Sequence, residues 1–111
     1  MEKMQIRVAK KEDIFEISRI YQQGTSEGRS YDFPDEPWEV LLKKRKKWFL
    51  RHDKRHPIFV AEIREKVVGW ISLQAFDERK FLQHVGEASV YVHQNFRGNG
   101  IGSALFQHLF S

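Results

Sequence analysis

Three glycines in five positions, Gly98, Gly100 and Gly102, are the residues whose type and spacing point most directly to chemistry. They follow a β-branched and aromatic run at residues 90–92 and precede apolar residues at helical spacing. A strand, a glycine turn and a helix start direct unpaired backbone N–H groups and the positive end of a helix dipole at one point. Glycines let an anion approach, because they carry no Cβ. Residues 90–103 therefore predict a cradle for a phosphate or pyrophosphate.

Two common phosphate-binding motifs fit this turn poorly. A mononucleotide P-loop requires Gly-Lys followed by Ser or Thr, but Gly102 is followed by Ser103 and Ala104. A dinucleotide-binding fingerprint needs a second strand with an acidic residue about 20 positions further on, and the sequence ends before that point. The pattern R-x-x-G-x-G/A of acyl-CoA-dependent acyltransferases is matched at each specified position by residues 97–102.

The spacing of apolar residues predicts the elements that must position this turn. Alternation indicates strands, and apolar residues at every third or fourth position indicate helices. Arg64 and Glu65 separate two strand-like runs, for which an antiparallel hairpin is the simple arrangement. In chain order we expect a strand (residues 4–9), a helix (10–23), a second helix (38–49), three strands (57–63, 66–76 and 87–93) and a last helix from about residue 100. This order predicts a single α/β domain.

Residues 24–37 hold two glycines and two prolines, which predicts a loop. The loop contains two aromatic residues, Tyr31 and Phe33. They either line a pocket or fold back onto the core, and the sequence leaves both interpretations open.

Composition narrows the class of protein. The 111 residues are 41% hydrophobic, contain no cysteine and show no apolar run of membrane-spanning length or signal-peptide segment. We therefore expect a cytoplasmic protein without a membrane partner and without a thiol nucleophile. The five histidines show no metal-ligand spacing, so we expect no metal.

The formal net charge of +4 arises largely from residues 43–56. Lysines in this stretch fall mostly off the apolar stripe of the second predicted helix, which indicates a solvated helix face. No nucleic-acid-binding motif accompanies the charge, and we expect no nucleic-acid partner. Arg45 is the exception, because it lies on the apolar stripe.

The sequence resembles the GNAT superfamily of N-acetyltransferases, and within it the phosphinothricin and methionine sulfoximine N-acetyltransferase branch. The resemblance covers most of the chain. It rests on the glycine motif and on an ordered series of segments: I-Y-Q-Q-G at residues 20–24, R-K-K-W-F at 45–49, V-A-E at 60–62, V-V-G-W at 67–70 and E-A-S-V-Y-V at 87–92. It implies a GNAT fold, a mixed and mostly antiparallel sheet with helices on both faces, and acetyl-CoA as co-substrate.

The resemblance also implies the cofactor residues. Backbone groups of Val90, Tyr91 and Val92 would contact the pantetheine arm and the acetyl group. Main-chain N–H groups of the turn would hold the pyrophosphate whatever the side chain. The residues expected at the pyrophosphate are Arg97, Gly98, Asn99, Gly100, Ile101, Gly102 and Ser103.

Glu87 aligns with the glutamate that this branch uses as general base. An amine arrives mostly as ammonium and must lose a proton before it attacks a thioester, so a carboxylate within reach suits the reaction. Backbone N–H groups of the same strand could stabilise the oxyanion. His84 and His93 are alternative bases, although His93 fits better as a residue that orders the turn.

Arg79 matches an arginine of the branch's R-x-A-Y-x-x-T-x-E pattern, whose guanidinium could pair with a substrate carboxylate. Phe81, Leu82 and Val85 stand where that pattern has Ala, Tyr and Thr. Tyr31 and Phe33 lie near a Thr-Phe pair of the branch and would form the opposite wall. The expected partner is a small amino-acid-like amine.

Members of the family continue beyond the position of Ser111. Residues 1–111 are therefore expected to form a single GNAT domain without its C-terminal strands, which leaves the edge at residues 90–92 unpaired. We expect an N-acetyltransferase that uses direct attack in a ternary complex. The alternative is an inactive CoA-binding or assembly module, completed by edge pairing with another chain, as in a homodimer.

Overall fold

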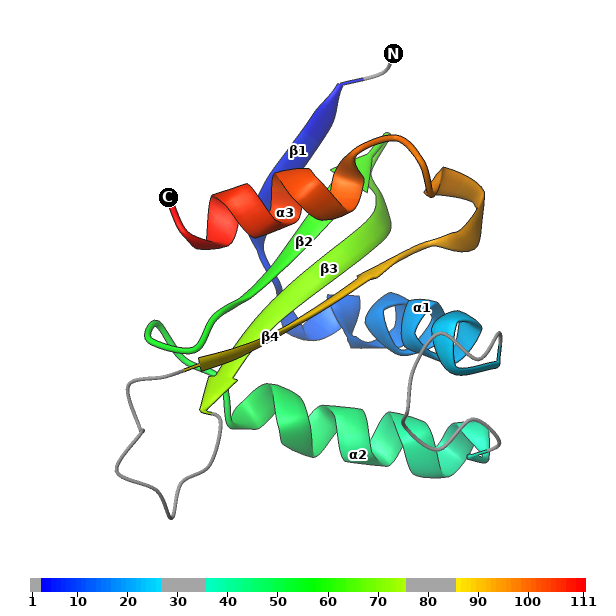
Figure 1. Ribbon diagram of the computed structural model, residues 1–111. Coiled ribbons are helices and arrows are strands. Elements are labelled where there is room, and N and C mark those ends of the chain that lie inside the picture. The colour runs from blue at the N-terminus through cyan, green and yellow to red at the C-terminus, as the bar shows by residue number, and fades with distance from the viewer. Residues whose placement is uncertain (1–2, 27–35, 76–85) are drawn as a thin grey trace.

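The computed structural model describes residues 3–26, 36–75 and 86–111, which form a four-stranded antiparallel sheet with helices on both faces (Figure 1). The strand order in the sheet, β1-β2-β3-β4, is also the order along the chain. The elements are β1 (Met4–Val8), the 3-10 helix η1 (Lys11–Asp13), α1 (Ile14–Ser26), α2 (Trp38–Leu50), β2 (Ile58–Ile63), β3 (Lys66–Ala75), β4 (Gly86–Val92), the 3-10 helix η2 (Gln94–Phe96) and α3 (Ile101–Leu109). The predicted order of strands and helices is confirmed.

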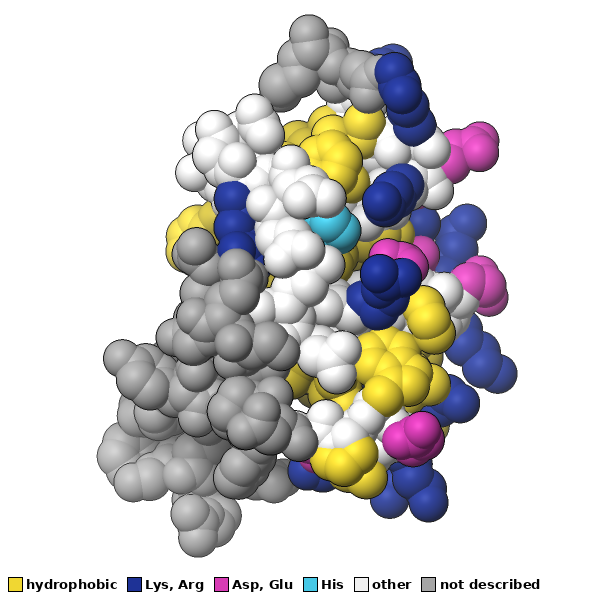
Figure 2. Space-filling view, turned by 90° about the vertical axis from the view of Figure 1, so that its right-hand side faces the viewer, with side chains coloured by type: hydrophobic (Ala, Val, Ile, Leu, Met, Phe, Trp, Pro, Cys, Tyr) yellow, Lys and Arg dark blue, Asp and Glu magenta, His cyan; other side chains and the backbone are white. Residues whose placement is uncertain are grey.

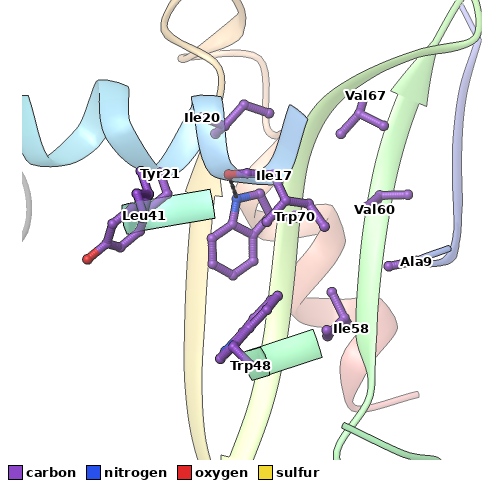
Figure 3. Close-up of a cluster of buried hydrophobic side chains, with 10 residues drawn as sticks. All are labelled: Ala9, Ile17, Ile20, Tyr21, Leu41, Trp48, Ile58, Val60, Val67 and Trp70. Atoms are coloured by element: carbon purple, nitrogen blue, oxygen red, sulfur yellow. Dashed lines mark hydrogen bonds between the residues drawn. The ribbon is translucent and has the colours of Figure 1, made fainter. Parts of the chain in front are cut away.

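Helices α1 and α2 cover one face of the sheet. The predicted stripe of α1 is buried there, with Ile14, Ile17 and Ile20 exposed by 6%, 0% and 0%. At the centre of the layer, Trp70 of β3 donates its Nε1–H to the carbonyl oxygen of Ile17 at 3.1 Å (Figure 3). An indole N–H buried without a partner would be destabilising, so this bond fixes how α1 lies on the sheet.

Helix α3 covers the opposite face. Ile101 and Leu105 lie one turn apart on α3 and pack with Val68 and Ile71 of β3. Gly69 lies beneath them, where a Cβ would stand 3.1 Å from Ile101 Cγ2 and 3.3 Å from Leu105 Cδ1. The absence of a side chain at residue 69 therefore allows α3 to approach the sheet closely.

The turn between β2 and β3 is the hairpin that the sequence predicts. Arg64 and Glu65 have φ angles of 53° and 63°. Two central residues with positive φ match the right-handed twist of the flanking strands. The turn therefore closes in two residues although neither is a glycine.

Arg7 ties β1 to its neighbours by ion pairs. Its guanidinium donates to both carboxylate oxygens of Asp13, at 2.8 and 3.0 Å, and to Glu62 of β2 at 3.2 Å. Burial raises the pKa of Asp13, but the hydrogen bonds from Arg7 and from the Lys10 N–H outweigh burial and hold this pKa below its usual value. Arg7 thus links β1 to η1 and β2.

Arg45 stacks on aromatic rings instead of facing water. Its guanidinium carbon lies 4.4 Å from the ring centroid of Tyr21 and 4.5 Å from that of Trp48. Aromatic faces attract a guanidinium, which explains a charged residue on the apolar stripe of α2. The lysines beside it, at residues 43, 44, 46 and 47, are exposed, as predicted.

The predicted end of α1 at residue 23 is wrong. The helix continues through Gly24 to Ser26, and a Cβ on Gly24 would stand 3.0 Å from two ring atoms of Tyr91. Residues 27–35, with Tyr31 and Phe33, lie outside the described residues. Within the described ranges, no helix combines the length and the apolar character needed to span a membrane.

Candidate functional site

Strand β4 pairs with β3 on one side and is the edge of the described sheet on the other. His93, the residue after β4, shows which backbone groups face β3, because its N–H donates to the Val68 carbonyl at 2.8 Å. Because the hydrogen-bonding direction alternates along an antiparallel strand, the backbone groups of Tyr91 also point to β3, and those of Val90 and Val92 point to the outer edge. Val90 thus presents its backbone N–H and carbonyl on that edge, and Val92 presents its N–H, whereas the Val92 carbonyl accepts a hydrogen bond from Arg97.

The side chains of β4 divide between the two faces of the sheet. Tyr91 lies on the face of α1 and α2, stacked on Trp70 with ring centroids 5.0 Å apart. Val90 and Val92 lie on the face of α3, where a Cβ on Gly102 would stand 3.9 and 3.8 Å from their methyl groups. The start of α3 and the outer edge of β4 are therefore neighbours in space.

The glycine turn has the conformation that its residues predict. Gly98 and Gly100 have φ angles of 82° and 78°, and no described heavy atom beyond the glycine and its chain neighbours lies within 4 Å of the position where either would carry a Cβ. The first helical hydrogen bond of α3 runs from the Ala104 N–H to the Gly100 carbonyl at 3.0 Å. The N–H groups of residues 101–103 belong to the first turn, which has no intrahelical acceptor for them.

Side chains brace the backbone of this turn. Arg97 donates its Nε–H to the Val92 carbonyl at 3.2 Å, and Asn99 donates to the Phe96 carbonyl at 3.1 Å. These bonds tie the first half of the glycine-containing segment to the residues that precede it. N–H groups without an intrahelical acceptor, glycines with open space and a braced backbone together fit a pyrophosphate.

His93 stands at the junction of β4 and the turn and is 7% exposed. Its Nδ1 accepts a hydrogen bond from the Asn95 N–H at 3.1 Å. This bond agrees with the prediction that His93 orders the turn. Burial, followed by the positive charge of Lys66, holds the pKa of His93 below its usual value.

Glu87 lies in β4 opposite Gln74 of β3, three positions before Val90. The structure therefore places its backbone on the same strand as the edge formed by Val90 and Val92. The proposed substrate residues Arg79, Tyr31 and Phe33, and the alternative base His84, lie outside the described residues.

The described residues include no group of three His, Asp or Glu side chains arranged to hold a metal ion.

Figure 2 views the side of the molecule on which the glycine turn lies in Figure 1. Lys and Arg side chains drawn on this face are interleaved with acidic and hydrophobic ones.

The structure also has a cavity of about 390 Å³ away from the glycine turn. No sequence pattern predicts it, because residues distant in the chain form it. Residues from β1, β2 and the C-terminal end of α2 line it, among them Val8, Phe49 and His52. His52 Nδ1 is hydrogen-bonded to the Trp48 carbonyl at 2.7 Å, and its Nε2 is buried from solvent. In Figure 1 the end of α2 and the glycine turn lie on opposite sides of the molecule.

Comparison with known proteins gives several matches. Of the curated relatives, the Bacillus subtilis protein YwnH, provisionally named a phosphinothricin acetyltransferase, is 33% identical over 105 residues, which are 94% of this chain and 63% of that protein. An uncharacterized N-acetyltransferase of Archaeoglobus fulgidus is 31% identical over 108 residues, covering 94% of this chain and 69% of that protein. The chain thus spans roughly two thirds of the length of these relatives.

Solved structures agree with the fold. An N-acetyltransferase from Staphylococcus aureus superposes with a TM-score of 0.84 at 32% identity, over 96% of this chain and 64% of that one. A GNAT superfamily phosphinothricin acetyltransferase from Sinorhizobium meliloti, in complex with acetyl-CoA, gives 0.80 at 28% identity, over 96% and 57% of the two chains. Residues 13–111 match the model of the acetyltransferase (GNAT) family. The expected fold is confirmed, and the chain belongs to the GNAT family of acetyltransferases.

Proposed function

We propose that this chain binds acetyl-CoA and serves in the transfer of its acetyl group to the primary amine of a small amino-acid-like substrate. The observation that carries the proposal is the position of Gly102, where a Cβ would stand 3.9 and 3.8 Å from the methyl groups of Val90 and Val92. The proposed anion-binding turn therefore lies beside a strand edge with outward-facing backbone groups. The acetyl-CoA complex of the Sinorhizobium meliloti structure supports the same cofactor.

The turn and the strand edge take different parts of the cofactor in this proposal. The pyrophosphate lies against the N–H groups of residues 101–103 at the positive end of α3. Gly98 and Gly100 leave it room, and Ser103 adds a hydroxyl donor. The extended pantetheine arm lies along the outer edge of β4 and bonds to the backbone of Val90 and Val92. The braces from Arg97 and Asn99 keep the turn in place.

Acetyl-CoA, when bound, would supply an activated acyl group. Both reactants would bind together, so that the amine attacks the thioester carbonyl directly, the carbon–sulfur bond breaks and coenzyme A leaves as its thiolate. Glu87 accepts the proton that the substrate ammonium loses. An outward-facing N–H of β4 stabilises the negative charge that develops on the acyl oxygen. We assign the binding of the amine substrate to Arg79, Tyr31 and Phe33, with the Arg79 guanidinium pairing with a substrate carboxylate.

Calorimetric titration with acetyl-CoA, followed by a turnover assay on a panel of amino acids and related amines, tests the proposal. We expect saturable binding and acetylation of at least one primary amine. Absence of binding at millimolar acetyl-CoA would overturn the proposal. Binding without turnover on the panel would contradict the transferase part and indicate the CoA-binding module instead.

A further inference from the structure

The junction between β4 and the glycine turn contains a buried histidine that the proposed reaction does not use. His93 follows the last residue of β4, and η2 begins at the next residue. The glycine turn, residues 97–103, comes after His93 in the chain. The inference below rests on the proposed cofactor binding, and it concerns how the turn is held.

His93 is bonded on both sides of this junction. Its N–H donates to the Val68 carbonyl of β3 at 2.8 Å, and its carbonyl accepts from the Phe96 N–H at 2.9 Å. The imidazole accepts from the Asn95 N–H through Nδ1, so the side chain caps η2. The ring also packs edge-on against Phe96, with centroids 5.6 Å apart. The backbone and the side chain of His93 therefore both hold the first residues after β4.

The cap that His93 provides to η2 holds the first residues of the glycine segment in place. Phe96 is followed directly by Arg97 and Gly98, and the Phe96 carbonyl accepts the bond from Asn99. The Gln94 N–H is bonded to the side chain of Gln23 in α1 at 3.0 Å, which fixes the other end of η2. Displacement of η2 would thus move the phosphate-binding N–H groups relative to the edge of β4.

We propose that His93 is a positioning residue for the cofactor turn, and that its neutral imidazole, as acceptor for the Asn95 N–H, maintains the affinity for acetyl-CoA. A protonated imidazole carries a proton on Nδ1 and would face the Asn95 N–H as a second donor. Protonation therefore releases the cap and weakens cofactor binding.

The charges around His93 set the direction of this effect. Burial, Lys66 of β3, Arg19 of α1 and Arg97 of the turn lower the pKa of His93, and Glu16 of α1 raises it. The result is a pKa below the usual value, so the neutral form is present near neutral pH. The contribution of the cap is complete above the unfolded pKa and is lost as the pH falls through the lower folded pKa.

The test measures binding of dephospho-coenzyme A by calorimetry between pH 5.5 and 8.5. This ligand keeps the pyrophosphate and pantetheine but has no phosphomonoester, a group that itself titrates with a pKa of about 6. The variants are His93→Asn, which offers an amide oxygen as acceptor and does not titrate, and His93→Phe, which keeps a ring and removes the acceptor. His56→Asn, in a turn distant along the chain, is the matched control.

We expect His93→Phe to raise the Kd about fivefold at pH 8, as the loss of a cap would, and His93→Asn to restore most of the affinity. The Kd of the wild-type protein rises as the pH falls toward 5.5, and so does that of His56→Asn. The Kd of His93→Asn changes less over the same range. Thermal unfolding of each variant verifies that the protein measured is folded.

Two results would overturn this inference alone: an unchanged Kd for His93→Phe at pH 8, or the same pH profile for the wild-type protein and His93→Asn. Failure of the wild-type protein to bind dephospho-coenzyme A or acetyl-CoA at pH 8 would instead overturn the proposed function, and this inference with it. The two failures are therefore distinguishable in one series of titrations.

Discussion

The ring of Tyr91 lies nearly parallel to the indole of Trp70, with the ring planes 19° apart and the centroids 5.0 Å apart. The Tyr21 ring of α1 lies 5.3 Å from Tyr91 on the same side of the sheet. Strand β4 has only one neighbour among the described strands, so this aromatic packing supplements its hydrogen bonds to β3. The outer edge at Val90 and Val92 is thereby held by side chains on the opposite face.

Replacement of Gly24 by alanine tests this packing. In an exposed helix the change stabilises by about 1 kcal/mol, but a Cβ on Gly24 would stand 3.0 Å from two ring atoms of Tyr91. Because Trp70 and Tyr21 confine that ring, we expect Gly24→Ala to lower the free energy of unfolding by about 1 kcal/mol. Urea denaturation measures the change.

The control for this prediction is the same change in a Tyr91→Leu background. Without the ring, Gly24→Ala should become neutral or stabilising, and the two substitutions should be non-additive. Equal effects in both backgrounds would show that the ring of Tyr91 does not set the requirement for glycine at residue 24.

Two glycines of the turn should respond differently to alanine. Gly100 has a φ of 78°, so Gly100→Ala strains the backbone and lowers stability by about 1 kcal/mol. Gly102 is helical, and its Cβ would make ordinary contacts of 3.8 and 3.9 Å, so Gly102→Ala should leave the stability unchanged or raise it. Thermal unfolding distinguishes the two variants.

Gly100→Ala should bind acetyl-CoA more weakly, because its Cβ would stand in the open space where the pyrophosphate is proposed to approach. Gly102→Ala should keep most of the affinity, since its Cβ would face Val90 and Val92 and the motif accepts alanine at this position. A Gly100→Ala protein that binds acetyl-CoA as tightly as the wild type would remove the glycine turn from the proposed site.

Glu87→Gln keeps the size of the side chain and removes the proposed base. We expect turnover at pH 7 to fall by about 100-fold or more, since a positioned base contributes a factor of that order. Glu65→Gln, at the exposed hairpin turn, is the matched control and should retain wild-type turnover. A decrease of less than about tenfold for Glu87→Gln would contradict the assignment of Glu87 as general base.

The Arg7 cluster predicts a pH dependence of stability. The folded pKa of Asp13 lies below its usual value of 3.8, so the carboxylate stabilises the fold above that pH. The contribution disappears as the pH falls through the folded pKa. At pH 7, Asp13→Asn should lower the free energy of unfolding by about 2 kcal/mol, as expected for a charge-assisted hydrogen bond.

Between pH 5 and pH 3 the difference between the wild-type protein and Asp13→Asn should shrink. Glu12→Gln, an exposed neighbour in η1, should change little at either pH. Denaturation at a series of pH values provides the measurement, and a constant difference down to pH 3 would contradict the role of the ionised Asp13.

Local patterns in the sequence predicted the elements and the turn, because their causes are local. The isoleucine stripe of α1 and the glycines with positive φ follow from spacing and backbone sterics. The positions of Gly24, Arg45 and Arg7 depend on contacts with Tyr91, Trp48 and Glu62, which lie on other elements. Such contacts are set by tertiary packing, and no single-sequence pattern encodes them.

Part of the candidate site could also be read from the sequence. The sequence predicts that His93 orders the turn, but its bond to the Asn95 N–H depends on the backbone path of η2, which no residue pattern encodes. The outward direction of Val90 and Val92 depends on the register with β3, which sequence alternation leaves undetermined by one residue.

Gly69 bears on any attempt to move this site into another protein. A Cβ at residue 69 would stand 3.1 Å from Ile101 and 3.2 Å from the Tyr91 carbonyl, so the height of α3 above β4 depends on a missing side chain in β3. Transplanting residues 90–103 alone would reproduce the sequence of the motif without the close approach of α3 to the sheet. The recipient sheet would also need a glycine at the matching position of the adjacent strand, so the smallest transferable unit comprises two strands and the helix.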